Sequence, residues 1–124
     1  MVTDFRFSLE NRPGSGARVL SALGQAGVNV IGVAAVSGGA TVHLAIDDGD
    51  AGRTRQALEG AGVSIERESQ VAVAPVEDRP GVGGALLQRI ADAGVNVEFV
   101  YLATNTRIIL GAEDPQAIEQ ALGR

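Results

Sequence analysis

The stretch Glu10-Asn11-Arg12-Pro13-Gly14 decides how this chain is organised, because it returns 67 positions later as Glu77-Asp78-Arg79-Pro80-Gly81. The similarity continues along the chain: residues 10–30 and 77–97 align without a gap, and 11 of the 21 aligned residues are identical. Chance does not produce such a match in a chain of 124 residues. The sequence therefore predicts two copies of one structural unit.

The repeated stretch has the composition of a tight loop that leads from a strand into a helix. Proline is tolerated in the first turn of a helix, where its missing N–H has no intrahelical partner, so we place Pro13 and Pro80 there. Gly14 and Gly81 let the backbone approach whatever lies in front of the helix. The free N–H groups of a helix start can hold a carboxylate or a phosphate. A single corner of this kind, however, more often only connects a strand to a helix.

Hydrophobic periodicity predicts the order β-α-β-β-α-β in the first copy, residues 1–69. The first expected strand covers 2–9, with Phe5, Phe7 and Leu9 facing the core and Asp4, Arg6 and Ser8 facing water. A helix follows that buries Leu20, Leu23 and Ala26 and ends at Gly27. The remaining elements are a strand at 28–36, a turn at 37–39, a strand with Val42, Leu44 and Ile46 facing the core, a helix capped within 47–50, and a short polar strand at 63–68. This order is the split βαβ, ferredoxin-like plan, with an antiparallel sheet and both helices on one face.

The second copy, residues 70–124, repeats this order as far as its second helix. The expected elements are a strand at 71–76, a helix that buries Val82, Leu86 and Ile90, a hairpin of 95–102 and 108–110, and a helix capped by Asp114 and begun by Pro115. No strand follows before Arg124. We therefore expect an α+β protein of two ferredoxin-like repeats with antiparallel sheets, the second lacking its last strand.

The missing strand would leave one side of the strand at 71–76 unpaired, which invites aggregation. We expect this side to be covered by the N-terminal segment or by the strand at 63–68 of a partner chain. No glycine or proline lies between Val63 and Val73, so the strands at 63–68 and 71–76 can also join into one long strand.

Composition and charge exclude several classes of function. Fifteen acidic and ten basic residues give a net charge of −5, and the arginines form no cluster, which argues against nucleic-acid binding. The chain has no lysine for a Schiff base or phosphate loop, and no cysteine for thiol catalysis or a thiolate metal site. It shows neither a secretory signal nor an apolar run that could span a membrane, so we expect a cytosolic protein without a membrane partner.

The repeated motif resembles the ACT domain, a small amino-acid-sensing module attached to many metabolic enzymes. The resemblance is carried by Asn11-Arg12-Pro13-Gly14, by Leu20 and Leu23, and by Gly27-Val28-Asn29-Val30, and both copies show it. It covers nearly the whole chain and implies a stand-alone tandem ACT protein. It also implies ligand contacts at Asn11, Pro13, Gly14, Val28, Asn29, Asp78, Pro80, Gly81, Val95 and Asn96.

Asn29 and Asn96 are the most informative of these residues, because an amide can donate to a carboxylate and accept from an ammonium group. Asparagine also suits a position beside a left-handed helix end for conformational reasons alone. The resemblance implies that the strand-to-helix loop and this asparagine face each other across a dimer interface. Some ACT sensors have a histidine two residues before the loop asparagine, where this chain has Leu9 and Val76, which argues against serine-type ligands.

Other polar residues predict no catalytic or metal site. The single histidine, His43, is expected at a surface or interface, and no carboxylate at ligand spacing accompanies it. The run Asp47-Asp48-Gly49-Asp50 lacks the spacing of a calcium loop and is expected to cap a helix. Arg12 and Arg79 could clamp a carboxylate, although an arginine before proline more often points to solvent or pairs with a partner subunit.

We therefore expect no enzyme, no cofactor and no metal, and two functions remain open. The first is a sensor that binds an amino acid at the strand-to-helix loops and regulates a metabolic enzyme or its own assembly. The second is a ligand-free module that only holds proteins together. In both cases edge-to-edge pairing of the two halves, within or between chains, should hide the apolar hairpin strands from water, and we expect a homodimer.

Overall fold

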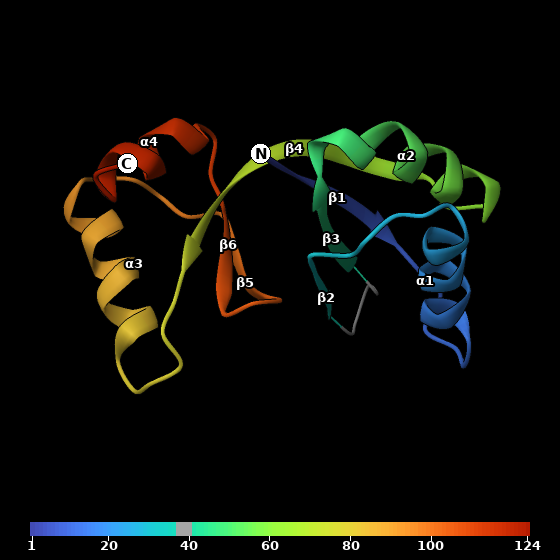
Figure 1. Ribbon diagram of the computed structural model, residues 1–124, viewed down its shortest axis with the longest axis horizontal. Coiled ribbons are helices and arrows are strands. Elements are labelled where there is room, and N and C mark those ends of the chain that lie inside the picture. The colour runs from blue at the N-terminus through green and yellow to red at the C-terminus, as the bar shows by residue number, and fades with distance from the viewer. Residues whose placement is uncertain (37–40) are drawn as a thin grey trace. The chain divides into compact units, whose positions relative to one another are not determined.

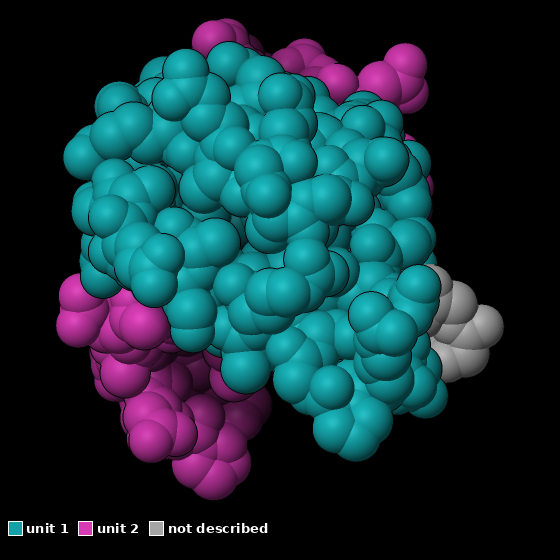
Figure 2. Space-filling view, turned by 90° about the vertical axis from the view of Figure 1, so that its right-hand side faces the viewer, with its two compact units in different colours: residues 1–69 teal, residues 70–124 magenta. Residues whose placement is uncertain are grey.

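The computed structural model describes residues 1–36 and 41–124, so the turn expected at 37–39 lies outside the described residues. The chain divides into two compact units, residues 1–69 (unit 1) and residues 70–124 (unit 2), which Figure 2 colours separately. The described residues form six strands and four α-helices, shown in Figure 1. The chain is therefore an α+β protein, as predicted.

Unit 1 contains a sheet with the strand order β2-β3-β1-β4, which is the order of the predicted ferredoxin-like plan. Its elements are β1 (Val2–Ser8), α1 (Ser15–Gln25), β2 (Gly32–Val36), β3 (Thr41–Asp47), the short 3-10 helix η1 (Asp48–Asp50), α2 (Ala51–Gly60) and the first part of β4 (Ile65–Pro75). β3 pairs antiparallel with both β1 and β2, and α1 and α2 cover the same face of this sheet (Figure 1).

The core of unit 1 lies between that sheet face and the two helices. It contains the following buried residues: Phe5, Phe7, Val19, Leu23, Val28, Val42, Leu44, Ile46, Leu58 and Val63. The expectation that Leu20 belongs to this core is wrong, because Leu20 is 43% exposed whereas Val19 is 2% exposed. Since α1 begins at Ser15, its buried stripe runs through Ser15, Val19 and Leu23, which are one helical turn apart.

The end of α1 shortens the strand that was expected at 28–36. Gly27 has φ +76° and ends the helix in the left-handed region, as predicted. The Val28 N–H then donates to the Leu23 carbonyl at 2.9 Å, so this part of the chain closes the helix. Strand β2 consequently begins at Gly32.

Asp4 is the clearest departure from the expected alternation in β1. We expected it to face water, but it is 1% exposed, and its Oδ2 lies 2.9 Å from Nδ1 of His43 on β3. A buried carboxylate is tolerated when a hydrogen-bond donor accompanies it. The histidine, expected at a surface or interface, is thus a largely buried partner of a carboxylate.

Unit 2 contains a sheet with the order β4-β6-β5, covered on one face by two helices. Its elements are the second part of β4, α3 (Val82–Asp92), β5 (Phe99–Ala103), β6 (Arg107–Gly111) and α4 (Pro115–Ala121). Its core contains Ala72, Ala74, Val76, Ile90, Ile108, Leu110, Ala112, Ile118 and Leu122. The strand expected at 95–102 begins only at Phe99, because the Val95 N–H returns to the Ile90 carbonyl at 3.2 Å.

The start of α4 is fixed by a side-chain cap within unit 2. Asp114 caps the helix as predicted, since its side chain accepts a hydrogen bond from the Gln116 N–H at 3.0 Å, and Pro115 is the first helical residue. The N-cap of α2 is Asp50, within the predicted stretch 47–50, but its side chain forms no cap hydrogen bond.

Strand β4 runs without interruption from Ile65 to Pro75, which confirms that the strands expected at 63–68 and 71–76 join. The Val76 N–H donates to the Thr106 carbonyl beside β6. Backbone groups of successive residues point to alternate edges of a strand, so the Val73 carbonyl, three residues earlier, points to the edge of β4 away from β6. There the Arg124 guanidinium donates to this carbonyl. Further cover of this side, by the N-terminal segment or by a partner chain, stays a prediction.

Candidate functional site

The repeated loop has the same backbone geometry in both copies. Gly14 has φ 88° and ψ −9°, Gly81 has φ 88° and ψ −14°, and each is the N-cap of the helix that follows. The placement of Pro13 and Pro80 in the first turn is therefore wrong, because both helices begin after the left-handed glycine. Only glycine adopts this conformation without strain, so the two glycines set the direction in which α1 and α3 start.

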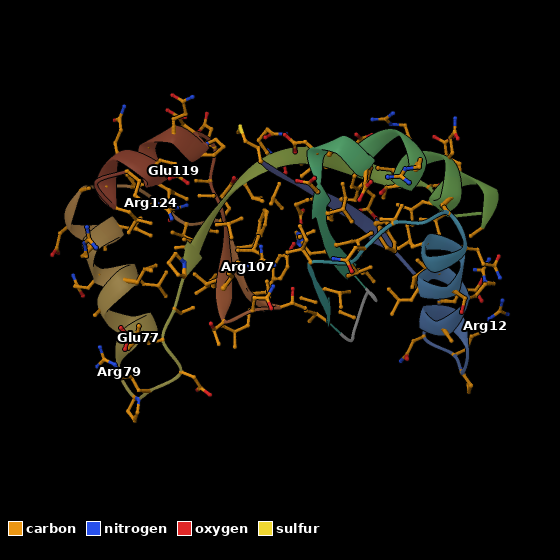
Figure 3. The ribbon with its side chains drawn as sticks, in the orientation of Figure 1. Arg12, Glu77, Arg79, Arg107, Glu119 and Arg124 are labelled. Carbon is orange, nitrogen blue, oxygen red and sulfur yellow. The ribbon has the colours of Figure 1, made fainter. Side chains whose placement is uncertain are left out.

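Hydrogen bonds and ion pairs of the loop are also repeated. The N–H of Arg12 bonds to the Glu10 carbonyl at 2.9 Å, and Arg79 and Glu77 make the same bond at 2.9 Å. The side chains pair as well, with Arg12 Nη1 at 3.1 Å from Glu10 Oε2 and Arg79 Nε at 2.6 Å from Glu77 Oε2. Figure 3 shows Glu77 and Arg79 side by side below α3. A guanidinium has five N–H donors, so each arginine keeps donors for a further acceptor.

Strand register shows that the predicted contacts of unit 1 lie at opposite ends of the unit. Ser8 and Val36 both pair with Thr41, so Asn11, Pro13 and Gly14 follow at that end of the sheet. Gly32 and Asp4 both pair with Ala45, so Val28 and Asn29 precede at the other end. A strand as long as β1 separates them by roughly 20 Å.

Unit 2 separates its predicted contacts in the same way. Asp78, Pro80 and Gly81 follow the end of β4, where Val76 bonds to Thr106. Val95 and Asn96 precede the other end of the sheet, where the Glu98 N–H bonds to the Gly111 carbonyl at 2.7 Å. Neither unit brings its loop and its asparagine together. A site that unites them needs a second copy of the repeat.

The side chains at these positions differ in exposure. Asn11, Asn29, Asp78 and Asn96 are exposed. Val28, in contrast, is 6% exposed and belongs to the core of unit 1, so only its backbone can contact a ligand.

A cavity of about 290 Å³ opens beside the loop of unit 1, and we call it the loop cavity of unit 1. Its lining residues are Ser8, Leu9, Glu10, Arg12, Ser15, Arg18, Gly62, Val63, Ser64 and Glu66. The sequence pattern did not predict the contribution of residues 62–66, because they join the loop only through the sheet, where β4 lies beside β1.

Both signs of charge occur in the loop cavity of unit 1. The Ser8 hydroxyl donates to Glu66 Oε1 at 2.6 Å, and Arg6 Nε lies 3.4 Å from Glu66 Oε2. The Arg18 guanidinium donates to the Ala61 carbonyl, which holds it against the cavity. The lining therefore offers guanidinium donors, carboxylate acceptors and serine hydroxyls in one small space.

The corresponding cavity of unit 2, the loop cavity of unit 2, has a volume of about 450 Å³ and a more apolar lining. It is lined by Pro75, Arg79, Pro80, Gly81, Val82, Ala85, Leu86 and Arg89. The Arg89 guanidinium donates to the Leu122 carbonyl at 2.9 Å. Asn11 and Asp78, two of the predicted ligand contacts, do not line these two cavities.

A third cavity, of about 350 Å³, lies at the helix-to-strand junction of unit 2. It is lined by Gly94, Val95, Asn96, Glu98, Ala112, Glu113, Asp114 and Ala117. The Asp114 carboxylate is occupied as the cap of α4. Within the described part of the chain, no group of acidic or histidine side chains has an arrangement that could hold a metal ion. The helices of that same part are too short or too polar to cross a membrane.

Comparisons with known proteins find no matching protein family and no significant match among curated protein sequences. Solved structures, in contrast, match over nearly the whole chain. The ligand-free regulatory subunit of aspartate kinase from Thermus thermophilus has a TM-score of 0.70 and 22% identity, over 98% of this chain and 89% of that one. A protein from Bacteroides thetaiotaomicron has a TM-score of 0.79 and 19% identity, over 99% of this chain and 88% of that one.

A third similar structure is aspartokinase III of E. coli, solved in complex with lysine and aspartate. It has a TM-score of 0.62 and 17% identity, and the match covers 98% of this chain and 30% of that enzyme. At these identities the likeness establishes a shared fold. The fold of this chain is therefore that of aspartate kinase regulatory subunits, which supports the resemblance to ACT-type domains at the level of architecture.

Proposed function

We propose that this protein is a regulatory module that binds a small amino acid and thereby controls a metabolic enzyme or its own assembly. The observation that carries the proposal is the loop whose left-handed glycine has nearly the same dihedral angles in both copies, in a fold shared with aspartate kinase regulatory subunits. Those similar structures include separate regulatory subunits, so a non-catalytic role for the chain agrees with them.

The proposed ligand contacts pair one copy of the repeat with another. Asn11, Pro13 and Gly14 of one copy would meet Val28 and Asn29 of a second. In the same manner, Asp78, Pro80 and Gly81 would meet Val95 and Asn96. Because the two sets lie at opposite ends of each unit, a ligand held by both sets joins two copies. Binding would then change assembly directly, which is the physical basis of the regulation.

A thermal-shift panel of the twenty amino acids tests the proposal. A ligand that binds only the folded state raises the melting temperature by mass action, by an amount that grows with its concentration. Asn29→Ala and Asn96→Ala should reduce this shift, and because both side chains are exposed, the melting temperature without ligand should hardly change. A flat panel would contradict the sensor function.

One observation favours the ligand-free assembly module as a second candidate. Strands β2 and β5 each pair with a single neighbouring strand in their unit. Both strands expose large apolar side chains, namely Val33, Val36, Val100 and Leu102. Exposed apolar strands of this kind favour association. We propose a homodimer for either function, and light scattering at micromolar concentration that shows a monomer would contradict it.

A further inference from the structure

We infer that the loop cavity of unit 2 is a docking groove for an extended segment of a partner protein, one that presents apolar side chains at alternating positions and carries a carboxylate. The inference goes beyond the proposed function, because the groove takes a protein segment and needs no amino-acid ligand. It rests on a comparison of the two units, in which residues 62–66 of unit 1 show how a segment of this kind packs at the same place in the fold.

The segment at 62–66 covers the first helix of unit 1. Val63 is 6% exposed and belongs to the same core as Val19 of α1, which is 2% exposed. Ile65, two positions further along, packs against that core as well. Residues two positions apart in an extended segment point to the same side. Alternating apolar side chains on this segment therefore cover the apolar face of α1.

In unit 2 the corresponding face of α3 is less covered. Val82 and Leu86 follow Gly81 at the spacing of the buried Ser15 and Val19 of α1, yet both are only half-buried and both line the loop cavity of unit 2. All lining residues of this cavity lie within 75–89, and its volume is about 450 Å³ against about 290 Å³ in unit 1. Apolar side chains left half-exposed along one helix face favour contact with another apolar segment.

The end of α4 shows why unit 2 does not cover α3 as unit 1 covers α1. Both second helices close with a left-handed glycine, Gly62 at φ 80° and Gly123 at φ 76°. The next N–H, of Val63 or of Arg124, bonds to the carbonyl five residues earlier at 2.9 Å. Arg124 thus takes the position of Val63, but its guanidinium donates to the Val73 carbonyl of β4. A charged side chain stands where unit 1 has an apolar one.

The charges of the groove suit a partner segment with a carboxylate. Arg79 and Arg89 line the groove, and no carboxylate is among its lining residues. Arg79 donates through Nε to Glu77, and Arg89 donates through Nη2 to the Leu122 carbonyl. A guanidinium has five N–H donors, so each arginine can donate to a further acceptor.

The edge of β4 offers few backbone groups to the partner. The Val73 carbonyl already accepts from Arg124, and Pro75 has no N–H. Side chains therefore carry the docking, and the groove differs from a sheet edge that accepts a complete strand.

A synthetic peptide of residues 61–69 is the probe, because it carries Val63, Ile65 and Glu66 in the order found in unit 1. Nitrogen-15 NMR of the full chain, without any amino-acid ligand, should show shifts at residues 79–89 when the peptide is added. In calorimetry, Leu86→Ala should weaken the affinity about tenfold, because part of an apolar contact is lost. Leu87→Ala is the matched control, since Leu87 is also partly buried on α3 but is not a lining residue, and it should leave the affinity unchanged.

Each outcome supports the docking groove or overturns it. A peptide with serine in place of both Val63 and Ile65 should not bind, and equal binding of the two peptides would overturn the inference. Shifts confined to residues 33–36 and 100–102 would show that the peptide binds the exposed edge strands instead. Shifts at 79–89 on raising the protein concentration alone would assign the groove to a second copy of the chain, which also overturns the partner segment.

The serine-substituted peptide tests the groove even if Leu86→Ala unfolds, which thermal melting of both leucine variants will show. None of these measurements uses an amino-acid ligand. The docking groove and the proposed sensor function can therefore fail independently of each other.

Discussion

Gly14→Ala should destabilise the fold even though it adds only one methyl group to an open surface. Gly14 is the N-cap of α1 with φ 88°, and a Cβ added to it would meet no atom within 4 Å. Steric overlap with neighbouring groups therefore contributes nothing to the expected effect. What remains is the intrinsic cost of a left-handed backbone for an alanine residue.

The magnitude follows from two opposing terms. A left-handed conformation costs a non-glycine residue about 1–2 kcal/mol. Replacing glycine also restricts the unfolded chain, which stabilises the fold by about 0.4–1 kcal/mol. The net loss is about 1 kcal/mol. With a urea slope of about 1–3 kcal/mol per molar, the unfolding midpoint should fall by roughly 0.5 M.

Gly16→Ala is the matched control, because Gly16 lies in the helical part of the same segment. An added Cβ would also meet no atom within 4 Å there, and Gly16 has no positive φ. Gly16 is the second residue of α1, and an alanine at a position whose backbone it can adopt stabilises the fold by about 0.4–1 kcal/mol, so this change should raise the midpoint. The two substitutions add the same methyl group and should act in opposite directions.

Urea unfolding of both variants, with the slope checked for constancy, measures the difference. The repeat supplies a second test, since Gly81→Ala and Gly83→Ala should reproduce the pair of results in unit 2. A midpoint for Gly14→Ala at or above that of the unmodified protein would refute the reasoning. It would mean that the loop relaxes to another backbone conformation that alanine adopts without strain.

Three further predictions concern other parts of the two units. Asp114→Ala removes the cap bond to the Gln116 N–H and should lower the free energy of unfolding by about 1 kcal/mol in a melting experiment. Asp50→Ala is the control, because Asp50 is the N-cap of α2 but forms no side-chain cap bond, and it should have a smaller effect. Gly111→Ala places a Cβ that overlaps the Phe99 ring and should destabilise the protein by about 1–3 kcal/mol. A double-mutant cycle with Phe99→Ala should show most of this loss relieved, and strict additivity would contradict the clash. The bidentate hydrogen bonds from Arg55, at 2.8 and 2.7 Å, lower the pKa of Glu68, so the pair stabilises the fold above the ordinary pKa of a glutamate and this contribution is lost as pH falls through the lowered pKa. Glu68→Gln should therefore cause a small drop in melting temperature at neutral pH and none at pH values below the lowered pKa, and an equal drop at both would contradict the assignment.

Most of the architecture could be predicted from the repeat, because the apolar core residues of both copies recur with the spacing of strands and helices. Alternation in β3 placed Val42, Leu44 and Ile46 in the core. The exact bounds of elements were less predictable. Val28 and Val95 belong to apolar runs that read as strands, yet their N–H groups close the preceding helices. This competition between a helix end and a strand start depends on backbone hydrogen bonds that apolar periodicity does not encode.

The burial of Asp4 shows a second limit of alternation. Residues 2–5 of β1 are all buried, so both faces of the strand are covered there, and a polar residue on the face away from the helices needs a partner from a neighbouring strand. The partner is His43, 39 positions away, and the pairing of Arg6 with His43 brings β1 and β3 into the register that allows it. Only strand register reveals such a pair, because the sequence separation carries no signal.

In the candidate site, too, features set by nearby residues could be predicted and features set by distant residues could not. Loop residues were predictable as a motif, since their conformation is set by neighbours within a few positions and repeats at Gly14 and Gly81. The residues that face the loop across the cavity were not predictable, because those at 62–66 are distant from the loop in the sequence. Sequence differences between the copies become informative only once the fold shows which of the differing residues line the same cavity. Ser15 and Val82 occupy equivalent positions at the starts of α1 and α3, and a hydroxyl in place of an apolar side chain makes the two cavities chemically distinct.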